Sequence, residues 1–164
     1  MAEENGNSRE QRDVGLYEKL AARTAEILEE GKKTLSEALE KAKEELSGAG
    51  EFFSREHAEK IGAYVLRDLS ENAGKAREAM VKALDPHRVT AGVQSVFARI
   101  LASTGETLSE LADIAERGLE FHTGEVTSPG TLTCRDCGAE VHMTRTSRIP
   151  PCAKCHKTAF RKSY

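Results

Sequence analysis

The sequence predicts a mainly α-helical chain, an elongated helical hairpin or three-helix bundle, followed by a small β domain at its C-terminal end. Charged residues make up 31 % of the 164 residues and aromatic residues 5 %, with no tryptophan. This composition favours helices with wide solvated faces over a β-sandwich. Apolar residues recur at the helical period through much of residues 16–115, which indicates amphipathic helices. Beyond residue 130 that period gives way to β-type residues and turn signals, which are typical of short strands.

The balance of charged residues also changes near residue 130. Residues 1–130 contain 17 Lys/Arg and 25 Asp/Glu, a balance of −8, whereas residues 131–164 contain seven and two, a balance of +5. All four cysteines lie in the basic part. We therefore expect four segments: a disordered tail over residues 1–13, a long-helix bundle over 14–120, a linker over 121–130 and a small domain over 131–164.

Neither a membrane span nor a secretory signal is evident in the sequence. The chain has no run of 18 apolar residues, and its first 13 residues are polar and acidic, without the apolar core of a signal peptide. The sequence thus predicts a cytoplasmic protein with no membrane partner.

Residues 16–46 are predicted to form one long helix with a single buried stripe. At 100° per residue, its apolar side chains fall within an arc of roughly 140°. These are Leu16, Leu20, Ile27, Leu28, Leu35, Ala38, Leu39, Ala42 and Leu46. The opposite face places a Glu four residues before a Lys, as in Glu37–Lys41, a pairing typical of a solvated face. Gly48 and Gly50 are expected to end the helix, because glycine accepts the left-handed conformation found there.

Two further helices are predicted. One begins with Ser54 as N-cap, has an apolar stripe that includes Ile61, Val65 and Leu69, and runs to about Leu84. There Asp85-Pro86 favours a break followed by a new helix. The third apolar stripe extends over residues 89–115, with a kink or split expected near Gly105. Since amphipathic helices of this length cannot bury their stripes alone, we expect them to pack as antiparallel neighbours. The alternative is that one stripe is a docking face or pairs with a second copy as a coiled-coil homodimer.

The four cysteines form two pairs with a characteristic spacing. Cys134 and Cys137 are followed, after fourteen residues, by Cys152 and Cys155, close to the spacing of four-cysteine zinc sites. Each C-x-x-C fits one tight turn with both sulfurs on the same side, and two such turns facing each other supply a tetrahedron about 2.3 Å from the metal. The sequence predicts a zinc ribbon holding one structural Zn²⁺. Gly138 suits the positive φ expected after the first pair, and His156 occupies the corresponding position in the second.

Other uses of the cysteines are less well supported. Two disulfides would require an oxidising compartment, and a redox-active C-x-x-C would need one pair in a strand–helix context. Iron in place of zinc remains chemically open. A closed four-thiolate set has no vacant position for a substrate, and the chain has no phosphate-binding glycine loop, nucleophile elbow or H-E-x-x-H motif. We therefore expect a protein that is not an enzyme.

The histidines are given structural or surface roles. His57 and His87 are expected at the surface, and His122 is expected to be a hydrogen-bonding residue of the linker. His142 and His156 flank the cysteines, and four thiolates already complete the coordination. None is predicted to be catalytic.

Several motifs resemble a known family. The segments at 122–126 and 130–134, the second C-x-x-C and the Phe-Arg pair near the end resemble the YbeL-like family of bacterial zinc-ribbon-containing proteins. The resemblance covers roughly residues 15–163, with its specific motifs in the C-terminal third. It implies a long helical region followed by a metal-binding ribbon, and it implies no activity. The chain departs from the family pattern at Asp85-Pro86 and at His156.

The basic C-terminal domain suggests two kinds of partner. Its seven cations, with Phe160 and Tyr164 nearby, suit a phosphate backbone and a stacked base. The acidic remainder of the chain would repel a polyanion, and zinc ribbons also dock on proteins. The favoured hypothesis is a protein-interaction or adaptor module, and the alternative is a nucleic-acid-binding or regulatory protein.

Overall fold

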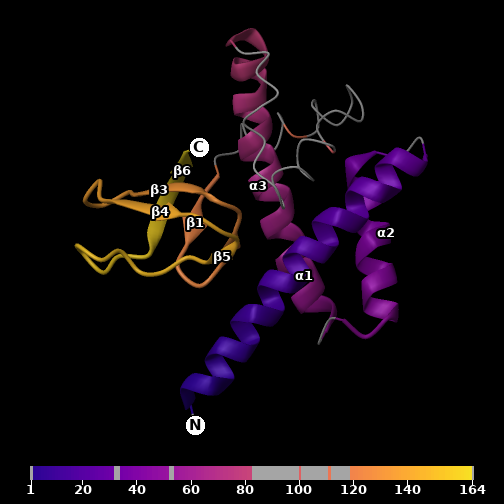
Figure 1. The fold of residues 1–164 in the computed structure, drawn as a ribbon, viewed down its shortest axis with the longest axis horizontal. Coiled ribbons are helices and arrows are strands. Elements are labelled where there is room, and N and C mark those ends of the chain that lie inside the picture. The colour runs from indigo at the N-terminus through magenta and orange to yellow at the C-terminus, as the bar shows by residue number, and fades with distance from the viewer. Residues whose placement is uncertain are drawn as a thin grey trace.

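The computed structural model describes residues 2–31, 34–51, 54–82, 100, 111 and 119–163. Three helices come first: α1 (Ala2–Glu30), α2 (Leu35–Gly48) and α3 (Arg55–Lys82). Short strands follow: β1 (Phe121–His122), β2 (Val126–Thr127), β3 (Gly130–Cys134), β4 (Glu140–Met143), β5 (Ser147–Arg148) and β6 (Ala159–Ser163). Figure 1 shows the helices packed together, with the strands beside α1 and α3. The mainly α-helical architecture with a small C-terminal β domain is confirmed.

The prediction of one helix over residues 16–46 is wrong. The helix ends at Glu30, and α2 begins at Leu35 and runs back along α1 (Figure 1). Thr34 is the N-cap of α2: its side chain accepts from the Glu37 amide at 3.2 Å, and the Glu37 carboxylate accepts from the Thr34 amide at 3.1 Å. This capping box satisfies two amides that a helix start leaves without partners, and Gly31 precedes it. The stripe was identified correctly, but its second half packs against its first half.

The segment over residues 1–13, expected to be a disordered tail, belongs to the first helix from residue 2 onward. Helix α1 begins at Ala2, and Asp13, near its middle, forms ion pairs with His57 and Arg148. Asp13 therefore joins α1 to α3 and to β5.

The predicted boundary between the second and third helices of the structure is confirmed. Gly50 has φ 74°, the Glu51 amide donates to the Leu46 carbonyl, and the Gly50 amide donates to the Ser47 carbonyl. Together these bonds form a Schellman motif, which explains the glycine. Ser54 then caps α3, its hydroxyl accepting from the His57 amide at 3.2 Å.

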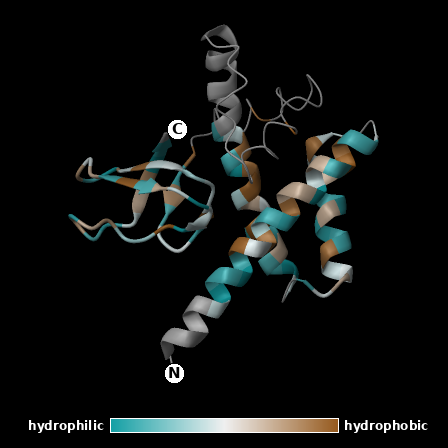
Figure 2. Cartoon of the chain, viewed as in Figure 1, coloured by the Kyte–Doolittle hydropathy of each residue, from teal (hydrophilic) through white to brown (hydrophobic). Residues whose placement is uncertain are grey.

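The three helices enclose one apolar core, and hydrophobic and hydrophilic segments alternate along each of them (Figure 2). Its buried residues include most of the predicted stripe: Leu16, Leu20, Ile27, Leu28, Leu35, Ala38, Leu39, Ala42, Ile61, Val65 and Leu69. From the predicted third helix the structure describes Ile100 and Leu111, both fully buried in this core. The expected break at Asp85-Pro86 and the kink near Gly105 lie outside the described residues.

The strands form two small antiparallel sheets. The larger has the order β1-β6-β3-β4, and the smaller pairs β2 with β5. In the larger sheet Leu132 pairs with Val141 on one side and with Lys162 on the other. The predicted strands around residues 131–133 and 141–144 are therefore present as β3 and β4, joined by the first cysteine pair.

Residues 121–130, expected to be a linker, include two short strands. They supply β1 and β2, which pair with β6 and β5, and Val126 lies in the helical core. The ribbon thus contacts α1 and α3 through β2 and β5.

Among the described helices, none has the length and apolar character that a membrane crossing requires.

Candidate metal centre

The two cysteine pairs lie in two turns of the same design. In the first, the Gly138 amide donates to the Cys134 carbonyl at 3.0 Å, and the Cys134 amide donates to the Ala139 carbonyl at 2.8 Å. In the second, the corresponding bonds run from His156 to Cys152 at 2.9 Å and from Cys152 to the Lys157 carbonyl at 3.0 Å. Each turn therefore holds its two sulfurs on one side, as the spacing predicted.

The structure brings all four sulfurs together. Their Sγ atoms lie within 4.8 Å of one another. The distance between Cys134 and Cys155 is 3.5 Å, and that between Cys137 and Cys152 is 3.6 Å. A tetrahedron with metal–sulfur bonds of about 2.3 Å has edges of about 3.8 Å, whereas a disulfide needs about 2.05 Å. The four cysteines are free thiols in this structure, and their spacing fits a metal and no disulfide.

The protonation chemistry of the cluster also fits a cation. The backbone amides of Cys155 and Lys154 lower the pKa of Cys152 to about 6. The Lys157 amide acts in the same direction on Cys155, but burial and the neighbouring sulfurs raise the pKa of that thiol to about 12. Four thiolates this close repel one another unless a cation lies between them. The four-sulfur donor set is the one that zinc prefers in structural sites.

The residue after each cysteine pair offers a matched test. Gly138 has φ 70° and His156 has φ 58°, in the left-handed region that costs a side chain roughly 1–2 kcal/mol. We expect Gly138→Ala to lower the unfolding free energy of the metal-loaded protein by about 1 kcal/mol. His156→Gly should raise it by up to about 1 kcal/mol because the strain is relieved. Thermal unfolding of both variants checks this, and effects of the same sign would contradict it.

Apolar side chains surround the sulfurs on the inner side of the ribbon. The buried members of this cluster are Phe121, Leu132, Cys134, Met143, Ile149, Cys152 and Phe160. This cluster is separate from the helical core. The ribbon therefore has only a small apolar core of its own. Domains of this size usually depend on a metal or on disulfides for stability.

The histidines, for which the sequence predicted surface or structural roles, lie in different environments. His57 is 16 % exposed and its Nε2 lies 3.0 Å from Asp13 Oδ1, so the prediction of a surface residue is wrong. His122 is half-exposed, with Glu120 and Glu125 within 4 Å. His142 is exposed and His156 occupies the second turn, whereas His87 lies outside the described residues.

A buried carboxylate joins the ribbon to the helices. Asp68 of α3 is fully buried and accepts hydrogen bonds from the Tyr17 hydroxyl, the Ser128 amide and the Thr127 hydroxyl. The amide bond is 2.7 Å long and the Thr127 bond 3.0 Å. Asp68 therefore links α1, α3 and the ribbon at one point.

Lys162 of β6 brings the matching positive charge to this point. Its Nζ donates to Thr127 Oγ1 at 2.7 Å and to the Ser128 carbonyl and hydroxyl at 2.6 and 2.8 Å, and it lies 3.7 Å from Asp68 Oδ2. Burial lowers the pKa of Lys162 to about 8, although Asp68 opposes this effect. The cation is thus retained in the interior by the Asp68 carboxylate and by oxygen acceptors of the ribbon.

Two more cation contacts flank this pair. Arg67 pairs with Glu125, donates to the Val126 carbonyl at 3.1 Å and lies with its Cζ 4.0 Å from the Phe121 ring centroid. On the other side Arg148 of β5 pairs with Asp13 of α1. In two of these pairs, Asp68–Lys162 and Asp13–Arg148, an acidic residue of the helices meets a basic residue of the ribbon, and in Arg67–Glu125 the signs are reversed. We call these contacts, centred on Asp68 and Lys162, the helix–ribbon interface.

The sequence contains a signal for this interface that the helical pattern obscured. Asp68 follows Ile61 by seven residues, or two turns, so it lies on the buried stripe of α3. Lys162 follows the buried Phe160 by two residues in a strand and shares its face. A charged residue at an inward position indicates a buried partner of opposite sign.

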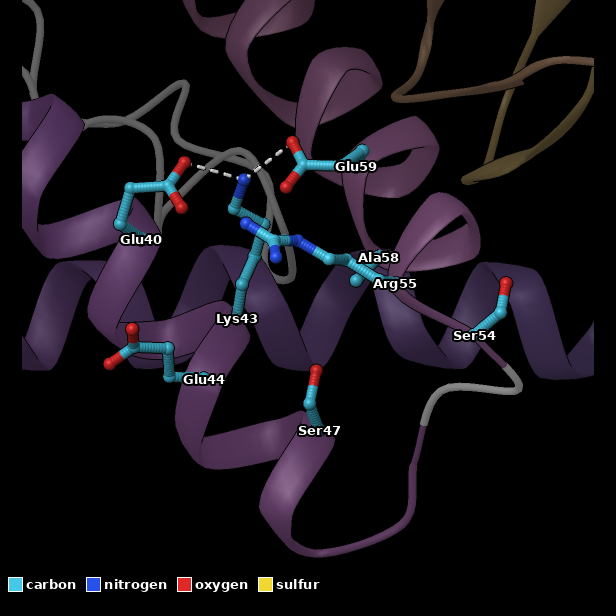
Figure 3. A pocket seen from close by; sticks show the side chains of 8 residues that line it. All are labelled: Glu40, Lys43, Glu44, Ser47, Ser54, Arg55, Ala58 and Glu59. Atoms are coloured by element: carbon cyan, nitrogen blue, oxygen red, sulfur yellow. Dashed lines mark hydrogen bonds and ion pairs between the residues drawn. The ribbon is translucent and has the colours of Figure 1, made fainter.

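A hollow between α2 and α3, of about 490 Å³, is lined by charged residues (Figure 3). Its central cation, Lys43, lies between Glu40 and Glu59, with its Nζ 2.5 and 2.8 Å from their carboxylates. The remaining lining residues are Glu44, Ser47, Ser54, Arg55 and Ala58. Since Lys43 is already paired and three carboxylates face the space, this hollow is poorly suited to an anion.

The fold and the cysteine cluster define the C-terminal domain as a zinc ribbon with a four-cysteine site. The chain belongs to the family described as a zinc-ribbon containing domain, which residues 22–163 match. It is similar to the uncharacterized protein YbeL of Escherichia coli strain K12 and to the protein of that name from E. coli O157:H7. Each is 25 % identical over 150 residues, covering 89 % of this chain and 92 % of the relative. No solved structure matches the chain.

Proposed function

We propose that the protein is a non-enzymatic interaction or adaptor module, in which one structural Zn²⁺ held by Cys134, Cys137, Cys152 and Cys155 stabilises the docking ribbon. Four thiolates complete the coordination of zinc, so the metal would have no open position for a substrate. The helix–ribbon interface supports an adaptor because it fixes the ribbon on a helical base, and a rigid surface loses little entropy on binding.

The burial and pairing of the ribbon's aromatic and basic residues favour a protein partner over nucleic acid. Phe160 is fully buried and is inaccessible to a base. Lys162 is buried, and Arg148 and Arg135 pair with Asp13 and Glu120. Three of the seven cations are therefore engaged within the chain. The other four cations of the ribbon, Arg145, Lys154, Lys157 and Arg161, are exposed.

Affinity purification with matched surface variants tests the proposal. Lys154 and Lys157 are exposed in and beside the second cysteine turn, and the control residue Lys60 is exposed on α3. We expect Lys154→Glu/Lys157→Glu to reduce recovery of a specific protein partner at least about tenfold, as loss of a central contact does. Lys60→Glu should leave recovery unchanged.

Two outcomes would contradict the adaptor proposal. Equal recovery by the paired variant and the control would exclude the ribbon as the docking surface. Loss of capture on nuclease treatment, together with a steep decrease of affinity for short RNA or DNA with salt, would favour the nucleic-acid alternative.

A further inference from the structure

A second hollow, of about 320 Å³, lies where the ribbon meets the helices and is separate from the cysteine cluster. It is lined by Arg9 and Asp13 of α1, His57 of α3 and Arg148 of β5. Three elements that are distant in the sequence therefore converge on it. Its volume is at the lower end of the range of small-molecule sites, about 300–1,000 Å³.

The charges around this hollow are unbalanced in favour of the cations. Asp13 is engaged through both oxygens, Oδ1 lying 3.0 Å from His57 Nε2 and Oδ2 accepting from Arg148 Nη2. Arg9 is exposed and forms no ion pair within the described part of the chain. Two guanidinium groups thus face a single carboxylate, unlike the hollow of Figure 3, in which carboxylates prevail.

One donor at this site lacks an acceptor. Arg148 Nε is buried and has no hydrogen-bond partner among the described residues. A buried N–H that has given up water normally has an acceptor in the folded protein. Guanidinium groups match the geometry of tetrahedral oxyanions, to which they donate through several N–H groups at once.

We propose that this hollow binds a phosphate group, with Arg9 and Arg148 as its cationic partners and His57 as a further polar contact. A free phosphate ion is smaller than the space, so the hollow also has room for the organic part of a phosphate monoester. The site does not depend on the proposed adaptor function, because none of its residues lies in the cysteine turns.

Titration of the zinc-loaded full chain with sodium phosphate and with glycerol 3-phosphate tests this, at constant ionic strength maintained with sodium chloride. Amide chemical shifts measured by NMR should saturate around residues 9, 13, 57 and 148. We expect Arg9→Gln to weaken phosphate binding at least tenfold. Arg12→Gln, an exposed neighbour on α1 that does not line the hollow, should change it less than twofold. The stronger binding of glycerol 3-phosphate would identify the ligand as a monoester, and equal binding would identify the free ion.

Arg9 is exposed, so its replacement is not expected to disturb folding, and Arg148→Lys provides a second variant that keeps the charge but loses the Nε donor. Shifts that increase linearly without saturation would overturn the proposal. The same conclusion would follow if Arg9→Gln and Arg148→Lys both bound phosphate as tightly as the unmodified chain.

Discussion

Replacing Asp68 by alanine is expected to lower the unfolding free energy of the zinc-loaded protein by about 3–5 kcal/mol, the cost typical of leaving one buried charge without its partner. The change removes the carboxylate that faces Lys162 and also leaves the Tyr17 hydroxyl and the Ser128 amide without this acceptor. Since small domains have total stabilities of about 5–15 kcal/mol, a loss of this size is large. Urea denaturation monitored by circular dichroism measures it.

A matched control separates this effect from the general effect of removing an acidic residue. Asp136 is exposed in the first cysteine turn, and Asp136→Ala should change the unfolding free energy by less than about 0.5 kcal/mol. An Asp68→Ala effect below about 1 kcal/mol, no larger than one ordinary hydrogen bond, would contradict the importance of the helix–ribbon interface.

A double-mutant cycle tests whether Asp68 acts through Lys162. Lys162→Met removes the buried cation while keeping a similar apolar chain. In the double variant Asp68→Ala/Lys162→Met neither charge remains, so the loss should be smaller than the sum of the two single losses by about 1–3 kcal/mol. Additive losses would show that the two residues stabilise the protein independently.

The helical core was predictable because burial leaves a periodic signal in the sequence. The residues of the predicted stripe from Leu16 to Leu69 that the structure describes are buried or partly buried. The break after Glu30 was missed because Leu28 and Leu35 are seven residues apart and remain in phase. One long helix and two helices folded against each other therefore share the same pattern. Only the local signals of Gly31 and the capping box at Thr34 and Glu37 distinguish the two.

The ribbon was predictable from its cysteines, since two C-x-x-C turns impose their own backbone geometry. The strands β1, β2 and β5 are each two residues long, too short for an alternating pattern to be detected. Their pairing depends on contacts between distant segments, such as Phe121 with Phe160 and Val126 with Arg148. The docking of the ribbon on α1 and α3 was missed because the inward positions of Asp68 and Lys162 indicate buried partners without identifying them, and the two residues are distant in the sequence.

Removal of zinc should unfold the ribbon while most of the helical structure remains. Metal binding supplies on the order of 10 kcal/mol of folding free energy in small zinc domains, and the described ribbon core contains few large apolar residues. Chelation, or Cys152→Ser, is therefore expected to abolish the tertiary signals of residues 119–163 with a smaller change in circular dichroism at 222 nm. Loss of most of the helical signal would show that the helices cannot fold without the ribbon.

The helix–ribbon interface adds an expected difference in the effect of Asp68→Ala between the zinc-bound and the zinc-free protein. When the ribbon unfolds, Asp68 loses Thr127, Ser128 and Lys162 together, so water must solvate it in the remaining helices. Asp68→Ala should then destabilise the zinc-free protein by less than about 1 kcal/mol, although it costs several kcal/mol when zinc is bound. The fluorescence of the three tyrosines is observable because the chain has no tryptophan, and it provides a further readout since the Tyr17 hydroxyl donates to Asp68. An equal effect of Asp68→Ala with and without zinc would mean that this carboxylate stabilises the helices alone, and that the metal and the helices are not coupled through it.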